Sequence, residues 1–342
     1  MFTRVLAISL AIGLYGCSAV SNPVEAQPVP EVVKSVPYSE LPEVQKFINK
    51  MASQHNYDRQ LLVSMFSNTY KREQVITKSD NQPEVITPYH EYRANFIDPY
   101  RVQQGVKFAQ RNKTWLEQAE RDYGVDWQVI VALLGVETAY GKVTGNRDVF
   151  TSLTTLSFDY PRRGAYFQSE LEAYLLLARN QGWTLGETKG SYSGALGMVQ
   201  FMPSNHMKLA VDYDQDGRID LWNSEADAIG SIANYLRHHG WQYQQRAAIP
   251  ARVDQAEQVS ELVNKGRAPL YSMNEWSTKG VWATTDYAAG KTGLIGLRES
   301  EEVVDYWLAY ENFFTIMDYN PSRRYAMSVL ELANRIAQHE GG

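Results

Sequence analysis

A long apolar run with one acidic side chain is the feature that most constrains how this chain folds. Residues 129–141 read Val-Ile-Val-Ala-Leu-Leu-Gly-Val-Glu-Thr-Ala-Tyr-Gly, and Glu137 is their only charged residue. The run predicts a helix that Asp126 caps at its start and Gly141 ends. A helix with so few polar residues is expected to lie inside the protein and to carry Glu137 with it.

The expected surroundings of Glu137 raise the pKa of its carboxyl group. Leu133, Leu134 and Tyr140 lie three or four residues away on the same helix face, so the group is poorly solvated. The last helical turn adds the negative end of the helix dipole. A raised pKa suits a general acid that works near neutral pH. A buried structural glutamate, paired with an arginine or a backbone donor, explains the same pattern, and the helix alone does not separate the two.

Composition sets wide limits on the function. The chain has 342 residues, which suffice for one elaborated domain or roughly two to three subdomains. Its net charge of −6 argues against a nucleic-acid partner held by bulk charge. The 22 tyrosines and 8 tryptophans suit a long carbohydrate groove, although a large aromatic core accounts for them equally well.

The first residues have the features of a bacterial export signal. Arg4 is followed by an apolar run over residues 5–15 that is too short to span a bilayer comfortably. The run ends in Leu14-Tyr15-Gly16-Cys17, which resembles the lipobox of bacterial lipoproteins. The resemblance implies that residues 1–17 form a signal peptide that ends at a lipidated Cys17. An ordinary secretory signal with a chance cysteine is the alternative.

Residues 18–40 predict an extended tether that lifts a folded domain off the membrane. They contain Pro23, Pro28, Pro30 and Pro37. Ser18, rather than Asp, follows Cys17, which favours the outer membrane of a Gram-negative cell, with the protein facing the periplasm. Cys17 is the only cysteine, so no intramolecular disulfide is expected.

Helical periodicity dominates after the tether, and four apolar stripes each predict a helix. The stripes are Val44, Phe47, Ile48 and Met51; Leu171, Tyr174, Leu175 and Ala178; Ile229, Ile232, Ala233 and Leu236; and residues 325–336. Residues 242–316 carry shorter apolar bursts broken by Gly and Thr, and they predict a small β-containing region.

A glycine-rich segment runs from Ser191 to Pro203 and reads Ser-Tyr-Ser-Gly-Ala-Leu-Gly-Met-Val-Gln-Phe-Met-Pro. Gly194 and Gly197 permit close backbone approach, and Gln200 places an amide just before a helix that begins with proline. Taken alone, the segment is more typical of a structural turn than of a binding site.

Several longer motifs follow one another in a fixed order. They are Tyr92-Arg93, Gly135-Val-Glu-Thr-Ala-Tyr-Gly141, Tyr160-Pro-Arg-Arg163, Gln200-Phe-Met-Pro-Ser204, Asp227-Ala-Ile-Gly-Ser-Ile-Ala-Asn-Tyr235 and Tyr325-Ala-Met-Ser-Val329. In this order the chain resembles the lytic transglycosylases, and most closely their membrane-bound, murein-cleaving branch. The resemblance extends from about residue 40 to the C-terminus.

The resemblance implies a mainly α (α+β) fold built around a lysozyme-like catalytic core. The core is expected at residues 126–241, and a small inserted β domain at residues 242–316. A helical domain at residues 41–125, completed by C-terminal helices at residues 317–342, is expected beside them.

The resemblance also implies the chemistry. Glycosidases generally use two carboxylates, but the Glu137 and Gln200 motifs contain only one. In this family a single glutamate, here Glu137, protonates the glycosidic oxygen and then takes the proton of the C6 hydroxyl that attacks the anomeric carbon. Cleavage of the MurNAc-GlcNAc β-1,4 bond then leaves a 1,6-anhydro-MurNAc end, with no catalytic cofactor.

Further residues are assigned to the saccharide by the resemblance. Ser191 and Gln200 correspond to positions that hydrogen-bond the sugar near the cleavage point. Arg162 and Arg163 are candidates for pairing with lactyl or peptide carboxylates, or they form a solvated pair after the turn. The aromatic groove residues correspond to Tyr92, Tyr166, Tyr235, Tyr319 and Tyr325. Tyrosine rings stack on sugars, and core packing is the alternative.

An acidic segment, residues 212–218, matches the first half of an EF-hand calcium loop. Asp212, Asp214 and Asp216 stand at ligand positions 1, 3 and 5, and Arg218 offers a backbone carbonyl at position 7. Asn223 replaces the usual Glu at position 12, and the resemblance moves the closing carboxylate to Asp227. The segment 212–227 therefore predicts structural Ca²⁺ without a part in the chemistry, and a solvated acidic turn is the alternative.

These observations predict a lipoprotein lytic transglycosylase, a monomeric lyase that acts on peptidoglycan glycan strands. A lipid anchor at Cys17 is expected to hold it on the membrane, and no nucleic-acid partner is expected. A non-catalytic murein-binding lipoprotein and a hydrolytic muramidase are the alternatives. The reaction products separate the three: anhydro ends, no cleavage or reducing ends.

Overall fold

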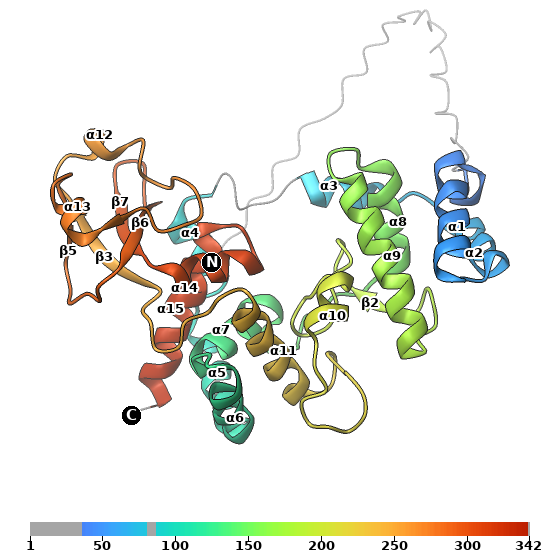
Figure 1. Cartoon of the computed structure of the whole chain (residues 1–342), viewed down its shortest axis with the longest axis horizontal. Coiled ribbons are helices and arrows are strands. Elements are labelled where there is room, and N and C mark those ends of the chain that lie inside the picture. The colour runs from blue at the N-terminus through green and yellow to red at the C-terminus, as the bar shows by residue number, and fades with distance from the viewer. Residues whose placement is uncertain (1–35, 81–86, 341–342) are drawn as a thin grey trace, which may run out of the picture. The chain divides into compact units, whose positions relative to one another are not determined.

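A computed structural model describes residues 36–80 and 87–340, which fold mainly into helices with one small sheet (Figure 1). The predicted fold class, mainly α with a smaller β part, is confirmed. Cys17, the predicted signal peptide and residues 18–35 lie outside the described residues. Within the described ranges, no helix is both long and apolar enough to cross a membrane.

The described helices include the four that the apolar stripes predict, which are α1, α9, α11 and α15. The named members of the first three stripes and most apolar residues of the fourth are buried, so these predictions are confirmed. The helices are η1 (Tyr38–Glu40), α1 (Pro42–His55), α2 (Arg59–Ser67), α3 (Glu73–Asp80), α4 (Tyr89–Ala94), α5 (Pro99–Arg111), α6 (Lys113–Tyr123), α7 (Trp127–Thr138), α8 (Val149–Asp159), α9 (Gly164–Gln181), α10 (Pro203–Leu209), α11 (Glu225–His238), α12 (Ala256–Val259), α13 (Met273–Ser277), α14 (Glu311–Tyr319) and α15 (Arg323–Glu340).

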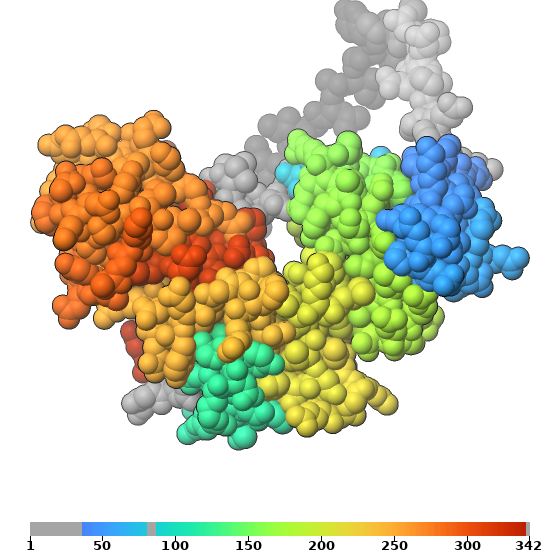
Figure 2. Space-filling model, viewed as in Figure 1, coloured from blue at the N-terminus to red at the C-terminus, as the bar shows by residue number. Residues whose placement is uncertain are grey.

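Buried apolar side chains gather in three cores. The largest surrounds α7, which is covered by α4, α5, α6, α11, α14 and α15. A second core joins η1 and α1–α3 to α8 and α9; in Figure 2 the blue residues of α1 and α2 lie against the light green residues of α9. The third lies between the sheet and the short helices α12 and α13. The helical domain predicted at residues 41–125 is therefore divided between two cores in this structure.

The β-containing region lies where the sequence predicts it, with one difference at its end. The strands are β1 (Arg147–Asp148), β2 (Lys189–Gly190), β3 (Ala248–Val253), β4 (Tyr271–Ser272), β5 (Val281–Ala283), β6 (Lys291–Arg298) and β7 (Val304–Ala309). The last five form an antiparallel sheet in the order β4-β6-β7-β3-β5. Residues 311–316 already belong to α14, because their large apolar side chains pack into the α7 core.

Strand β6 connects two of the cores. Ile295 and Leu297 pack into the core around α7, whereas Leu294 packs into the core under the sheet. Neighbouring residues of a strand point to opposite faces, so both faces of β6 are covered. The sheet is thereby held against the helical core around α7, the helix that carries Glu137.

The predicted tether ends too late in the sequence. Tyr38 is only 1% exposed, and its ring lies 6.2 Å from that of Phe158. Its backbone N–H donates to Thr69 O at 3.1 Å, and its hydroxyl donates to the carboxylate of Asp159. Tyr38 therefore belongs to the second core, and proline content alone does not reveal this because the contacts come from distant residues.

Candidate active site

Helix α7 places Glu137 in its last turn, as the sequence predicts, but both helix ends differ in detail. The helix ends at Thr138, not at Gly141, because Ala139 and Tyr140 both adopt left-handed φ angles of 49° and 61°. Asp126 is the N-cap residue, yet its side chain makes no capping bond and accepts instead from Trp241 Nε1 at 3.0 Å. The chain thus turns sharply directly after the acidic residue.

The turn after Glu137 explains two other residues of the motif. Tyr140 folds back over α7, and its hydroxyl donates to Arg101 O at 3.0 Å. A Cβ atom on Gly135 would lie 2.6 Å from that hydroxyl oxygen, so only glycine fits beneath the tyrosine. These contacts fix the end of the helix that carries Glu137.

Burial raises the pKa of Glu137 from 4.5 to about 7. The hydroxyl of Tyr325, in the first turn of α15, donates to Glu137 Oε1 at 2.5 Å and opposes this rise by stabilising the ionised form. Among the described residues Glu137 forms no ion pair, so the arginine-paired structural glutamate does not apply. The carboxyl group is therefore poised to hold a proton near neutral pH.

The glycine-rich segment is joined directly to the end of α7. Thr138 Oγ1 donates to Met198 O at 2.8 Å and accepts from Gly141 N at 3.0 Å. Gly197 has φ 65°, and a Cβ atom there would lie 2.5 Å from Leu221 O. Gln200 also has a left-handed φ, 52°, and its Nε2 donates to Gly197 O at 2.9 Å and to Thr144 O at 3.1 Å. The threonine after Glu137 therefore sets the position of the Gln200 turn.

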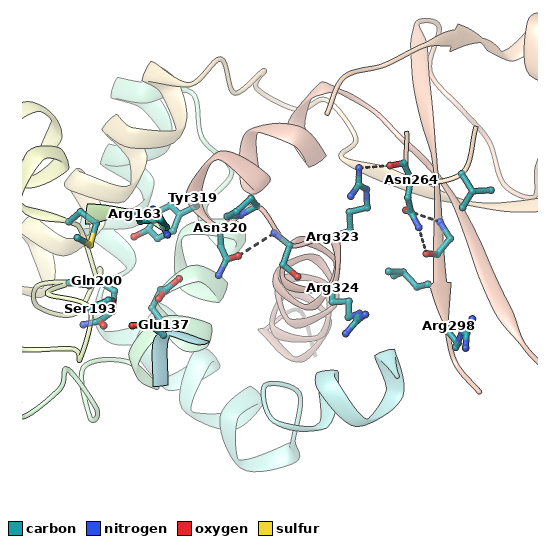
Figure 3. Close-up of a pocket in the computed structure, with 18 of the residues that line it drawn as sticks. Glu137, Arg163, Ser193, Gln200, Asn264, Arg298, Tyr319, Asn320, Arg323 and Arg324 are labelled. Atoms are coloured by element: carbon teal, nitrogen blue, oxygen red, sulfur yellow. Dashed lines mark hydrogen bonds between the residues drawn. The ribbon is translucent and has the colours of Figure 1, made fainter. Parts of the chain in front are cut away.

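Glu137 and Gln200 line the same open cleft, which has a volume of about 1270 Å³. Figure 3 shows Gln200 and Ser193 beside Glu137, with Tyr319 and Arg163 nearby. The opposite part of the cleft is lined by the first residues of α15 and by β6 and its neighbouring loops. All three cores contribute to its walls. Glu137 comes from α7, at the centre of the first core, Phe167 belongs to the second core, and Val263 packs against the third.

Comparison with known proteins identifies the family. The transglycosylase SLT domain matches residues 39–334. Membrane-bound lytic murein transglycosylase B of Escherichia coli (strain K12) is 37% identical over 305 residues, which are 86% of this chain and 83% of that protein. This chain belongs to the lytic transglycosylases. The resemblance that its motifs predict is confirmed, and the protein is an enzyme of the lyase type.

Two solved structures share the fold of this transglycosylase. The Escherichia coli lytic transglycosylase Slt35 in complex with calcium has a TM-score of 0.80 and 36% identity, over 90% of this chain and 96% of that one. SltB3 from Pseudomonas aeruginosa, in complex with NAG-anhNAM-pentapeptide, has a TM-score of 0.73 and 29% identity, over 86% of this chain and 79% of that one.

Five of the nine predicted saccharide-binding residues line the cleft of the transglycosylase: Ser191, Gln200, Arg163, Tyr166 and Tyr319. The guanidinium of Arg163 lies 4.4 Å from the ring centre of Tyr166, whose side chain is 39% exposed. Ser191 Oγ accepts from Ala195 N at 2.9 Å and lies 3.1 Å from Ser193 Oγ, which lines the cleft beside it.

The other four predicted binding residues do not line the cleft. Arg162 points to solvent and pairs with Asp80 at 3.3 Å. Tyr92 is buried with its ring 5.1 Å from that of Phe96. Tyr235 is 3% exposed because its ring packs into the core around α7. Tyr325 is also 3% exposed, because it lies behind Glu137. The burial of the three tyrosines matches the core-packing alternative, apart from the hydroxyl of Tyr325, and Arg162 matches the solvated alternative.

Tyr235 still supports the cleft from behind. Its ring lies 4.8 Å from that of Tyr319 and stacks on His239 at 4.2 Å. Its hydroxyl donates to Asp318 O at 2.7 Å, and the hydroxyl of Tyr319 donates to Val199 O. Tyr319 is thus held between α11 and the residue before Gln200.

Residues that local patterns did not single out complete the cleft. They are Asn264 in the loop before β4, Arg298 on β6, and Asn320, Arg323 and Arg324 around the start of α15 (Figure 3). Their sequence surroundings carry no chemical motif, because they meet Glu137 only through the packing of α15 against α7 and of the sheet against α15.

The acidic loop brings three of the four predicted carboxylate ligands together. Oxygen atoms of Asp212, Asp214 and Asp227 lie within 4.8 Å of one another. Asp216 is outside this group, and its Oδ1 accepts from Arg218 N at 2.9 Å. The two oxygens of the buried Asp227 accept backbone N–H groups of Tyr213 and Asp220, at 2.7 and 2.8 Å.

Proposed function

We propose that this transglycosylase cleaves the MurNAc-GlcNAc β-1,4 bond of peptidoglycan glycan strands and leaves 1,6-anhydro-MurNAc ends. The observation that carries the proposal is Glu137, which lines an open cleft and has its pKa raised to about 7 by burial. The relatives support the substrate, since one is a murein transglycosylase and another holds NAG-anhNAM-pentapeptide.

Glu137 acts as the sole general acid and base in this proposal. Its carboxylic acid gives a proton to the glycosidic oxygen while the bond from that oxygen to C1 breaks. The C6 hydroxyl of the MurNAc that contains C1 then forms a bond to that C1 and gives its proton to Glu137. No water is consumed, and the carboxyl group ends as it began.

Among the described residues no second acid lies beside Glu137, which favours transglycosylation over hydrolysis. No neighbouring carboxylate contributes to the raised pKa of Glu137. Glu257, on α12 beside the sheet, is the other carboxylate among the described residues that line the cleft. A hydrolytic glycosidase positions a second carboxylate to activate water or to attack C1.

The sugars are held by the lining residues beside Glu137. Tyr166 and Tyr319 offer ring faces and hydroxyl groups, and Gln200 and Ser191 supply polar groups from one rigid turn. Arg163, stacked over Tyr166, pairs with a lactyl or peptide carboxylate.

The acidic loop binds a structural Ca²⁺ through Asp212, Asp214 and Asp227. Three carboxylates with converging oxygens suit a hard cation, and a calcium complex of a relative supports the choice. The ion neutralises the negative charge of the three carboxylates and fastens the loop to the start of α11. It has no part in proton transfer.

Lipid attachment at Cys17 anchors the enzyme to the outer membrane, facing the periplasm, where it works as a monomer. The lipobox-like residues 14–17 and a membrane-bound relative support the anchor. A single acyl chain holds a protein only marginally, whereas the several chains of a processed lipoprotein give stable attachment.

Mass analysis of the products tests the proposal. Digestion of purified murein should yield anhydro-muropeptides 18 mass units below the hydrated products, since no water is added. Glu137→Gln should keep the fold and abolish turnover, because the amide cannot donate the proton. Proton transfer alone contributes a ~10²–10⁴-fold increase in rate. Reducing ends would instead identify a muramidase, and binding without cleavage would identify a murein-binding protein. Substantial turnover by folded Glu137→Gln protein would remove Glu137 from its role.

A further inference from the structure

One end of the cleft carries three arginines that form no ion pair with any described residue. Arg298, Arg323 and Arg324 line it, beyond Asn320 as seen from Glu137 in Figure 3. Together with Arg163, four arginines line the cleft against two carboxylates, Glu137 and Glu257, although the chain as a whole has a net charge of −6. Positive charge is therefore concentrated in the cleft, although the net charge of the chain is negative.

Three of the carboxylates around this end are already paired with other cations, whereas Glu257, which also lines the cleft, forms no ion pair among the described residues. Glu299 and Glu331 lie 3.4 and 3.6 Å from Arg93, and Asp318 lies 2.7 Å from Arg267. Across residues 36–80 and 87–340, none of the three cleft arginines Arg298, Arg323 and Arg324 forms an ion pair. Each of them therefore keeps its charge without an ion-pair partner in the described part of the chain.

The hydrogen bonds of the cluster hold it in place without neutralising it. Arg323 Nη2 donates to two backbone carbonyls, Asn264 O at 2.7 Å and Gly266 O at 2.5 Å. Arg323 Nε and Arg324 Nη1 are buried and have no acceptor among the described residues. Because these two nitrogens are closed to solvent, the other guanidinium nitrogens of the cluster are the ones left for an anion in the cleft.

The wall behind the cluster is rigid. Asn264 adopts a left-handed φ of 59°, and its side-chain amide exchanges two hydrogen bonds with the backbone of Gly296, at 2.9 and 3.3 Å. A Cβ atom on Gly296 would lie 2.7 Å from Val263, so the loop and β6 are closely apposed. A preorganised set of donors loses less entropy when an anion binds.

We propose that Arg298, Arg323 and Arg324 bind the carboxylates of a stem peptide carried by the glycan strand, at a muramic acid residue away from the cleaved bond. The inference rests on the proposed function, because it takes murein as the substrate. Sugar hydroxyls are neutral and do not compensate three guanidinium groups, whereas peptide carboxylates accept the paired N–H groups of arginine. The cluster is distinct from Arg163, which lies beside Glu137.

The test compares one set of glycan strands before and after an amidase has removed the stem peptides. The full chain and its Arg298→Gln, Arg324→Gln and double variants are assayed on both substrates, and kcat/KM is measured from newly formed chain ends. On peptide-bearing strands each substitution should lower kcat/KM about tenfold, as expected for the loss of a charged hydrogen bond. On denuded strands, whose remaining carboxylates are lactyl groups, the rate should not change.

Two further proteins make the comparison specific. Arg252→Gln removes the same charge from an exposed arginine on β3 that lies outside the cleft, and it should leave both rates unchanged. Arg324→Lys keeps the charge but loses the planar fork, and its loss on peptide-bearing strands should be smaller than that of Arg324→Gln. Raised salt should weaken the reaction on peptide-bearing strands more than the reaction on denuded strands.

The outcomes separate this inference from the proposed function. Equal losses on both substrates, or no loss on either, would overturn the peptide site while anhydro products still upheld the enzyme. If the variants lost kcat/KM on both kinds of strand but not on neutral chitin oligosaccharides, the cluster would be reassigned to lactyl carboxylates. A wild-type protein that released no anhydro ends from either strand would overturn the proposed function itself. Arg298 is exposed on its strand, so Arg298→Gln is expected to fold and keeps the test valid if Arg324 variants do not.

Discussion

At the scale of single residues, two opposing effects set the pKa of Glu137: burial and a hydrogen bond from Tyr325. Burial raises the pKa of its carboxyl group to about 7, whereas the Tyr325 hydroxyl lowers it by donating to Oε1. The pKa of Tyr325 itself lies well above its usual value, so this hydroxyl keeps its proton and remains a donor. Among the described residues Oε2 has no such partner, and it is the oxygen that remains for the substrate.

Tyr325→Phe should therefore move the pH dependence of the reaction in a defined direction. Loss of the donor destabilises the carboxylate, so the pKa of Glu137 rises above about 7. Since the protonated form acts first, the alkaline limb of the kcat/KM profile should shift to higher pH. The rate at its optimum should fall, because the carboxyl group is held less firmly.

Tyr89→Phe provides the matched control for this shift. Tyr89 is another buried tyrosine that donates to a carboxylate, Glu331, at 2.8 Å, but it does not line the cleft. Its substitution should leave the alkaline limb in place. If the limb of Tyr325→Phe stayed put or moved to lower pH, the hydroxyl would not control the acidity of Glu137.

At the scale of elements, the short connections carry the site and the helices hold them. The Gln200 turn is bound to α7 through Thr138, and the acidic loop is bound to the start of α11 through Asp227. In that loop Ser224 Oγ accepts the N–H of Asp227 as an N-cap, while both carboxylate oxygens of Asp227 turn back to the loop. One buried aspartate thus joins the loop to the helix that carries Tyr235.

Calcium should raise the melting temperature of the protein, because the ion binds only the folded loop. A ligand at 100 times its dissociation constant adds ~2.7 kcal/mol of stability, which corresponds to a shift of several degrees. Asp214→Asn should remove most of this increment, since Asp214 belongs to the converging group. Asp216→Asn should remove less of it, because that carboxylate lies outside the group.

Thermal melts in EDTA and in excess calcium measure the effect, and rates in the cold show whether chemistry survives. Equal melting temperatures with and without calcium, in a metal-free preparation, would leave the loop as a solvated acidic turn. Loss of the whole increment in Asp216→Asn alone would mean that the ligands are arranged differently.

At the scale of the whole molecule, the cleft exists only where the three cores meet. α7 supplies Glu137, α9 supplies Tyr166 and the β6 region supplies Arg298. The core of η1 and α1–α3 supports α9 from behind, and Tyr38 is its first buried residue in the described chain. The folded enzyme therefore begins no later than Tyr38.

Two truncations should separate anchoring from folding. A protein that begins at Val36 should leave the membrane fraction, keep its melting temperature and cleave isolated murein at the normal rate. One that begins at Leu41 should lose about 3–5 kcal/mol of stability, the usual cost of deleting a buried aromatic side chain. Fractionation, thermal melts and rates on isolated murein check both.

Cys17→Ser in the full chain is the control for the anchor, because it removes the proposed lipidation site and should leave the fold intact. It should move the protein to the soluble fraction without lowering its rate on isolated murein. If it still sedimented with membranes after a high-salt wash, another surface would hold the protein there.

Local sequence determined those features that depend on periodicity and chain order. The apolar run predicts α7 and a glutamate near its end, the stripes predict four helices, and the ordered motifs predict the family. The acidic segment predicts a loop whose carboxylates converge, and three of them do. Such patterns are readable because the residues involved are neighbours in the chain or on one helix face.

Only the tertiary structure decided which side chains reach the cleft. Tyr325 donates to Glu137 from 188 residues away, and Tyr235 turns into the core although its motif places it among groove residues. Arg298, Arg323 and Arg324 meet at the cleft because α15 packs on α7 and the sheet packs on α15. A side chain's direction relative to a distant wall depends on how the helices and the sheet pack, and no local pattern contains that information.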